Sequence, residues 1–150
     1  MPGMFRIELA PYQAEPMNSV MDQSVQSVVL MWASQTGKTE IINNIIGYHI
    51  DLDPSPILCL QPTLEIATSW STDRLSPMVR DTPVLKKLVA DPKARDSGNT
   101  KLHKKFMGGH ITIAGANSPA SLAARPIRVV LCDEVDRYPD SAGGEGDPIS

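Results

Sequence analysis

The 150-residue sequence is poor in the residue types that mark several specialised protein classes. It has two cysteines, each inside an apolar run, which is typical of reduced core thiols in a cytosolic protein rather than of a disulfide scaffold. The three histidines have no ligand spacing with these cysteines, so no zinc site is expected. No run approaches the roughly 18 apolar residues needed to cross a bilayer, and the N-terminus lacks the apolar core of a secretory signal. With a net charge of −3, no global basic field points to nucleic acid.

What is present is the pattern of one ordinary α/β domain. The helical spacing over 39–49, the Thr63 helix start and an interrupted helical stretch over 72–95 alternate with apolar runs typical of buried strands. The four predicted strands are 27–32, 57–60, 110–114 and 128–133. This alternation predicts crossover connections and a parallel sheet with flanking helices. Ligands of such sheets bind at the carboxyl ends of the strands.

A phosphate-binding loop is predicted at residues 33–39, between the first strand and a helix. Gly37 lets the backbone approach a phosphate, Lys38 can reach the β- and γ-phosphates, and the Thr39 hydroxyl can ligate Mg²⁺. The other loop residues assigned to the ATP site are Ser34, Gln35 and Thr36. The usual G-x-x-x-x-G-K-[ST] pattern is broken, because Trp32 stands where the first glycine belongs. The alternative interpretation is an ordinary helix start with an exposed lysine.

A pair of carboxylates ends the fourth predicted strand. Asp133 is the candidate for the Mg²⁺ shell, and Glu134 is the candidate to orient and deprotonate the attacking water. Neighbouring residues of a strand point to opposite faces, so the two side chains suit different tasks if the strand bends at its end. An acidic turn is the alternative, but a phosphate loop and an acidic pair together are more specific than either alone.

Three further features leave alternatives open. Tyr12 can stack on adenine while the Gln13 amide reads its edge, or the tyrosine packs on the domain surface. Arg125 is either a charge-stabilising arginine or a solvated one. The lysine-rich stretch 86–105 can follow a phosphate backbone, or it is a solvated helical face.

These residues resemble the large terminase subunit of the lambda-type (GpA) phage family. The resemblance covers nearly the whole chain, and its most specific part is the Asp-Glu-Val-Asp-Arg-Tyr-Pro run at 133–139. The other matching segments are 11–17, 34–39, 61–63, 70–78 and 118–122.

The resemblance implies an ATP-driven, Mg²⁺-dependent motor that moves double-stranded viral DNA into a capsid in the host cytoplasm. It implies a P-loop NTPase of the additional-strand, catalytic-glutamate class. Lys38 and Thr39 would form the Walker A pair, Asp133 the Walker B metal ligand and Glu134 the catalytic glutamate, with Tyr12 and Gln13 beside the adenine. The implied partners are the small terminase subunit, the capsid portal and further copies of the chain.

The sequence departs from the family pattern in two respects. Residues 33–36 offer no basic residue for a charge-stabilising finger. The last sheet strand, the coupling segment and the C-terminal nuclease are expected after the acidic pair and are not found. We therefore expect 1–150 to be one P-loop ATPase domain, with an adenine-side segment at 1–24 and a core at 25–150, incomplete at its C-terminus. Such a chain is expected to be marginally stable or to self-associate.

Two other functions stay open. One is a nucleotide-binding assembly module without turnover, and the other is a helicase-like ATPase acting on nucleic acid outside packaging. A turnover assay distinguishes the first from a motor, and helicase motifs downstream would be needed for the second.

Overall fold

A computed structural model of the chain describes residues 6–89, 99–118 and 126–140. The chain divides into two compact units, residues 1–45 and residues 46–150, and the division falls inside helix α2 (Lys38–Asp51). Within the described ranges, no helix has the length and apolar character needed to cross a membrane.

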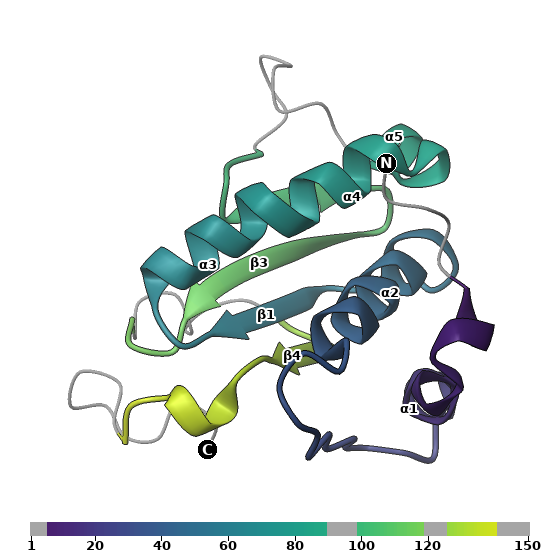
Figure 1. Cartoon of the computed structure of the whole chain (residues 1–150). Helices are drawn as coiled ribbons and strands as arrows, with labels where there is room; N and C mark the ends of the chain where they lie inside the picture. Colours follow the sequence, from purple (N-terminus) through teal and green to yellow (C-terminus); the bar gives the residue numbers. More distant parts are fainter. Residues whose placement is uncertain (1–5, 90–98, 119–125, 141–150) are drawn as a thin grey trace. The chain divides into compact units, whose positions relative to one another are not determined.

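The first unit begins with short helical pieces. Two 3₁₀ turns, Ile7–Leu9 and Pro11–Gln13, lead into α1 (Ala14–Met21), drawn in purple in Figure 1. Pro11 starts its turn because its fixed φ suits the first helical position and its missing N–H would be unpaired there anyway. Sequence periodicity did not predict α1, since the helix spans eight residues and buries none of them.

The predicted buried strand at 27–32 is wrong. These residues form no strand, and the side chains of Val29 and Met31 are 77% and 92% exposed. An apolar run becomes a buried strand only when neighbouring strands supply ladder hydrogen bonds on its flanks. No strand in the described ranges pairs with this segment.

The second unit holds a four-stranded sheet in the order β2-β3-β1-β4. Its strands are β1 (Ile57–Gln61), β2 (His103–Phe106), β3 (Gly109–Gly115) and β4 (Val129–Cys132). β1 pairs in parallel with both β3 and β4, whereas β2 runs antiparallel to β3. The three strands predicted in this unit are confirmed. β2 was missed because two adjacent lysines in His-Lys-Lys-Phe break the alternation of apolar and polar residues that predicts a strand, although the burial of the side chains does alternate.

The sheet of this unit is buried on both faces along β1 and β3. Ile57 and Cys59 of β1 are fully buried, and their register partners Ile111 and Ile113 of β3 are each 1% exposed. Leu131 of β4 lies opposite Cys59 on the same face. Leu60 of β1 and its register partner Ala114 of β3, which point to the other face, are 2% and 0% exposed. Burial on both faces accounts for the continuous apolar runs seen in the sequence.

Helices follow β1 in close succession. They are α3 (Leu64–Trp70), a π-helical turn (Ser71–Leu75), α4 (Ser76–Asp81) and α5 (Pro83–Leu88). The Thr63 hydroxyl accepts a hydrogen bond from the Ile66 N–H at 3.2 Å and caps α3, as its sequence position predicted. The prolines at 77 and 83 lie in the first turns of α4 and α5. Pro83 starts α5 after the extended Thr82. The backbone is helical from α3 through the π-helical turn into α4, so Pro77 does not interrupt the helix there. α3 and α4 follow one another along β3 (Figure 1).

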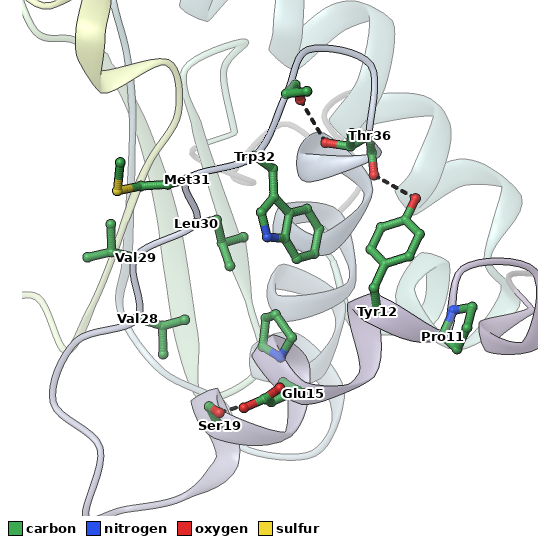
Figure 2. A pocket seen from close by; sticks show the side chains of 12 residues that line it. Pro11, Tyr12, Glu15, Ser19, Val28, Val29, Leu30, Met31, Trp32 and Thr36 are labelled. Atoms are coloured by element: carbon green, nitrogen blue, oxygen red, sulfur yellow. Dashed lines mark hydrogen bonds between the residues drawn. The ribbon is translucent and has the colours of Figure 1, made fainter.

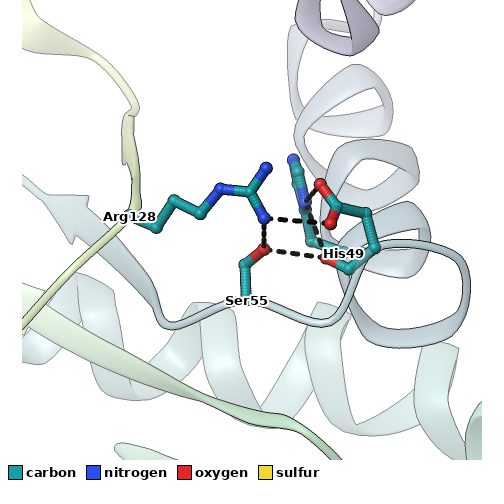
Figure 3. Close-up of polar contacts among 4 residues, drawn as sticks. His49, Ser55 and Arg128 are labelled. Atoms are coloured by element: carbon teal, nitrogen blue, oxygen red, sulfur yellow. Dashed lines mark hydrogen bonds and ion pairs between the residues drawn. The ribbon is translucent and has the colours of Figure 1, made fainter. Parts of the chain in front are cut away.

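A polar cluster ties the end of α2 to the starts of β1 and β4 (Figure 3). Arg128 Nη1 donates to Asp53 Oδ1 and to Ser55 Oγ, both at 2.9 Å. Ser55 Oγ donates to the Asp53 carbonyl at 2.8 Å, and His49 Nδ1 lies 3.2 Å from the same oxygen. Because Ser55 and His49 are buried, these bonds satisfy polar atoms that would otherwise be costly to bury.

Candidate nucleotide-binding site

The loop before α2 has the backbone of an anion-binding turn. Gln35 has φ of 59° and Gly37 has φ of 85°, so two alternate residues are left-handed immediately before Lys38 opens the helix. Loops of this kind gather backbone N–H groups into anion-binding concavities, and the first N–H groups of a helix have no intrahelical partners. The side chains of Ser34 and Gln35 are exposed, and Thr39 is half-buried in the first turn of α2.

Lys38 folds back over the loop that precedes it. Its ammonium donates to the carbonyl oxygens of Trp32 and Ala33 at 3.0 and 2.8 Å. The Thr36 hydroxyl donates to the same Ala33 oxygen at 2.8 Å. Lys38 is therefore held against the loop by neutral acceptors, which bind an ammonium less strongly than a phosphate does.

The two residues predicted to flank adenine lie against this loop. Tyr12 Oη donates to the Thr36 carbonyl at 3.1 Å, as Figure 2 shows, and Gln13 Nε2 lies 3.4 Å from the same oxygen. Gln13 is 4% exposed, and its Oε1 is buried without a hydrogen-bond partner. A Cβ on Gly37 would lie 2.4 Å from Gln13 Nε2, so the absence of a side chain at 37 makes room for the amide.

A groove of about 840 Å³ opens beside Tyr12 (Figure 2). The Trp32 ring meets the Tyr12 ring edge to face, with centroids 5.2 Å apart and an interplanar angle of 75°. Pro16 and the 28–31 segment also line the groove. The sequence analysis placed Trp32 at the end of a predicted strand and treated it as a break in the phosphate-loop pattern. Its position next to the loop was the signal that could have identified it as a lining residue.

The acidic pair lies in the second unit, at the carboxyl end of β4. The Asp133 N–H donates to the Leu60 carbonyl at 3.1 Å, which extends the β1–β4 ladder by one residue, and Asp133 is 9% exposed. Glu134 then adopts a left-handed backbone with φ of 50°. The bend that would give the two carboxylates different directions is therefore present.

Neutral groups surround the end of β4. Burial raises the pKa of the Cys59 thiol to about 12 and raises the pKa of Cys132 as well. Burial, followed by the nearby Cys132 and Cys59, also raises the pKa of Tyr138, whose hydroxyl donates to the Leu60 carbonyl at 2.9 Å. These three groups stay protonated at neutral pH and add no negative charge next to Asp133.

Sequence reasoning missed one residue at this end of the sheet. Gln61 is the last residue of β1, and it is 2% exposed beside the Cys59 thiol. Continuing the β1–β4 register by one residue places it opposite Asp133. A polar residue that ends a buried strand at the carboxyl edge of the sheet was the available signal.

The predicted site residues thus fall into two groups. Tyr12, Gln13 and the loop 34–39 come together in the first unit. Asp133 and Glu134 are adjacent in the second. Arg125 lies outside the described residues.

Comparison with known families assigns the chain. A family model described as "Phage terminase large subunit gpA, ATPase domain" matches residues 1–150. The chain belongs to this family. No curated protein and no solved structure matched. Membership in this terminase family indicates an ATPase domain with a role in phage DNA packaging, and it confirms the resemblance seen in the sequence.

Proposed function

We propose that this terminase chain is an ATP-hydrolysing motor domain that powers movement of double-stranded viral DNA into a capsid. The observation that carries the proposal is the loop at the start of α2. There Lys38, two left-handed residues and the adenine-side pair Tyr12 and Gln13 occur together in a member of a terminase ATPase family. The fold that accords with it is a P-loop NTPase of the additional-strand, catalytic-glutamate class.

In this proposal the first unit binds the nucleotide. The loop N–H groups and the positive end of α2 hold the phosphates. Lys38 exchanges its two carbonyl partners for phosphate oxygens, which gains charge-assisted hydrogen bonds. Tyr12 contacts the adenine, and the buried Gln13 Oε1, which has no partner, accepts a hydrogen bond from the adenine amino group.

The second unit supplies the acidic residues. A hydroxyl and a carboxylate are the hard oxygen donors that Mg²⁺ prefers. Thr39 in the first unit and Asp133 in the second are each such a donor, and each is proposed as a Mg²⁺ ligand on the family resemblance. When bound, Mg²⁺ neutralises charge on the phosphates. Glu134 orients the attacking water and accepts its proton, a role that its exposed carboxylate permits.

The wider proposal follows the family. Residues 1–150 act as one ATPase domain, with 1–24 on the adenine side and 25–150 as the core. The domain works in a homo-oligomeric motor together with a small terminase subunit and the capsid portal, in the host cytoplasm.

Calorimetry of Mg²⁺-ATP binding tests the nucleotide site. We expect saturable binding by the intact chain, loss of binding in Lys38→Ala, and no change in the matched control Lys101→Ala, whose side chain is exposed outside the site. A folded intact chain that does not bind ATP would overturn the proposal.

Turnover tests the catalytic assignment. Glu134→Gln should bind ATP normally and lose about 10²- to 10⁴-fold in kcat, the range typical of a lost general base. Asp136→Asn, an exposed carboxylate two residues away, should retain activity. Normal binding with no turnover by the intact chain would favour the non-hydrolysing assembly module. Turnover stimulated by single strands but not by duplex DNA would favour the helicase-like ATPase.

A further inference from the structure

We propose that a basic edge of the second unit contacts the phosphate backbone of duplex DNA; this rests on the proposed motor function. The basic edge consists of four exposed lysines, Lys86 and Lys87 in α5, Lys101 before β2 and Lys105 in β2.

The structure joins the end of α5, which carries Lys86 and Lys87, to the strand that carries Lys105. β2 is the outermost strand of the sheet, and Val89, which follows α5, forms an antiparallel bridge with Phe106 at the end of β2. The Met107 N–H donates to the Leu88 carbonyl at 3.3 Å. The last turn of α5, with Lys86 and Lys87, is therefore fastened to the end of β2. Lys87 and Lys105 are therefore distant in sequence, but the elements that carry them are joined in the fold.

Among the described residues, the charge of this edge is of one sign. The described stretches 82–89 and 99–118 contain no aspartate or glutamate, although the chain as a whole carries a net charge of −3. Asp81, just before the first stretch, pairs with Arg80 at 2.7 Å. In the described part of this edge the four ammonium groups have no carboxylate among them and repel one another, and a polyanion would relieve that repulsion. The segment 90–98, which joins the two pairs and contains Asp91 and Asp96 as well as Lys93 and Arg95, lies outside the described residues.

The pleat of β2 decides which lysines are available. Lys104 lies opposite Ile111 on the core face and is 7% exposed, and burial lowers its pKa. Lys105 lies opposite His110 on the other face and is exposed. One lysine of the strand therefore packs inside, and its neighbour reaches solvent beside the His103 and His110 rings, whose centroids are 5.4 Å apart.

The backbone of this edge is already occupied. The Thr100 N–H donates to the His103 carbonyl and the Asn99 side chain accepts from the Lys105 N–H, both at 2.7 Å. Together with the Val89 bridge to Phe106, these contacts cap the outer side of β2. An added peptide strand would find its main-chain partners taken, so the edge has its lysine side chains left to offer a partner.

Lysines bind phosphates as flexible point charges and lack the rigid, planar fork of arginine. The partner that fits is thus a regular phosphate backbone of any sequence. Such binding weakens steeply with salt, because each neutralised phosphate releases counterions. The number of phosphates that the lysines neutralise can therefore be measured from the salt dependence of the binding constant.

The test is fluorescence anisotropy of a labelled short duplex with the full chain at several salt concentrations. Replacing Lys101 and Lys105 by glutamine should weaken binding and flatten the plot of log K against log salt by about 0.9 per lysine removed. Lys86→Gln with Lys87→Gln should do the same. A control that removes two cations elsewhere, Arg6→Gln with Arg74→Gln, should leave the slope unchanged. A duplex of scrambled sequence should give the same slope.

Two additional measurements distinguish a lost DNA contact from a misfolded edge and from a failed nucleotide site. Lys101→Arg with Lys105→Arg retains both charges and should restore the slope, whereas a misfolded edge would not be rescued. All variants should bind Mg²⁺-ATP like the intact chain, so a loss of nucleotide binding identifies failure of the proposed function instead. If glutamine variants with normal ATP binding keep the full salt slope, the inference is overturned. The lysines would then be an ordinary solvated face of the domain.

Discussion

Arg137 holds the carboxylate of Glu134 from within the same short loop. Arg137 Nη1 donates to Glu134 Oε2 at 2.6 Å, and the Arg137 N–H donates to the Glu134 carbonyl at 2.9 Å. The left-handed backbone of Glu134 turns the chain away from β4 and into the 3₁₀ turn Val135–Arg137. The orientation of the proposed catalytic carboxylate is thus set locally, by residues of the most family-specific run in the sequence.

This pairing predicts that Arg137→Ala impairs turnover more than stability. Both side chains are about half exposed, and ion pairs of that kind contribute at most about 1 kcal/mol to the free energy of unfolding. A catalytic group that loses its orientation slows the chemical step, so kcat should fall severalfold while ATP affinity is retained. The matched control is Arg80→Ala, which removes a similarly exposed pair with Asp81. Equal kcat values for the two variants would show that Arg137 does not position Glu134.

A second prediction concerns Gly37 and Gln13. Gly37→Ala puts a Cβ at a residue with φ of 85° and within 2.4 Å of Gln13 Nε2. The left-handed backbone should cost about 1–2 kcal/mol of unfolding free energy, and the displaced amide should lower ATP affinity. In a Gln13→Ala background the steric conflict is gone and the backbone cost remains. Urea unfolding and ATP titration of the two single variants and the double variant should therefore show less than additive losses. Strict additivity would mean that the two residues do not interact.

The sequence was most informative where one local signal determined the outcome. Thr63 caps α3, and the apolar runs at 57–60, 110–114 and 128–133 became β1, β3 and β4. Such elements depend on their own residues and on burial in a parallel sheet, both of which leave a pattern in the chain.

The failures have a common physical cause, which is dependence on partners. The 27–32 run has strand composition, but a strand also needs a ladder on its flanks, and in the described chain this run has none. β2 is the reverse case, because His103-Lys104-Lys105-Phe106 has little strand character and is recruited by pairing with β3. The bonds of Tyr12 and Gln13 to the phosphate loop likewise connect residues more than 20 positions apart, and spacing alone could not indicate them.

The exposed 27–32 run predicts association of the isolated chain. Val29 and Met31 present large apolar side chains to solvent, and β4 pairs with β1 on one side only within the described sheet. Extended apolar segments and open sheet edges favour pairing between chains. Sedimentation velocity should show concentration-dependent self-association, reduced in Val29→Lys with Met31→Lys. Leu9→Lys, which replaces another side chain that is 82% exposed, is the control. A monodisperse monomer with cooperative unfolding would count against this prediction.

The buried thiol of Cys59 predicts a loss of stability in alkali. Burial raises its pKa from 9.0 to about 12, so the folded chain keeps the proton that the unfolded chain releases above about pH 9. Its contribution is therefore complete below pH 9 and is lost as the pH rises toward 12, at ~1 kcal/mol per pH unit. Cys59→Ala should lower stability by a constant amount below pH 9 because it leaves a cavity, and should flatten the decline above it.

Urea unfolding under reducing conditions between about pH 8 and pH 10.5 measures that difference in slope. Groups common to both chains cancel in the comparison, so what is left reports the Cys59 proton. Cys132→Ala is the matched control, because that thiol is only half-buried and burial raises its pKa less than that of Cys59. Its curve should flatten less than that of Cys59→Ala. Parallel curves for the intact chain and Cys59→Ala would show that the thiol ionises equally well in both states, and that the end of β4 beside Asp133 is more open to water than its burial indicates.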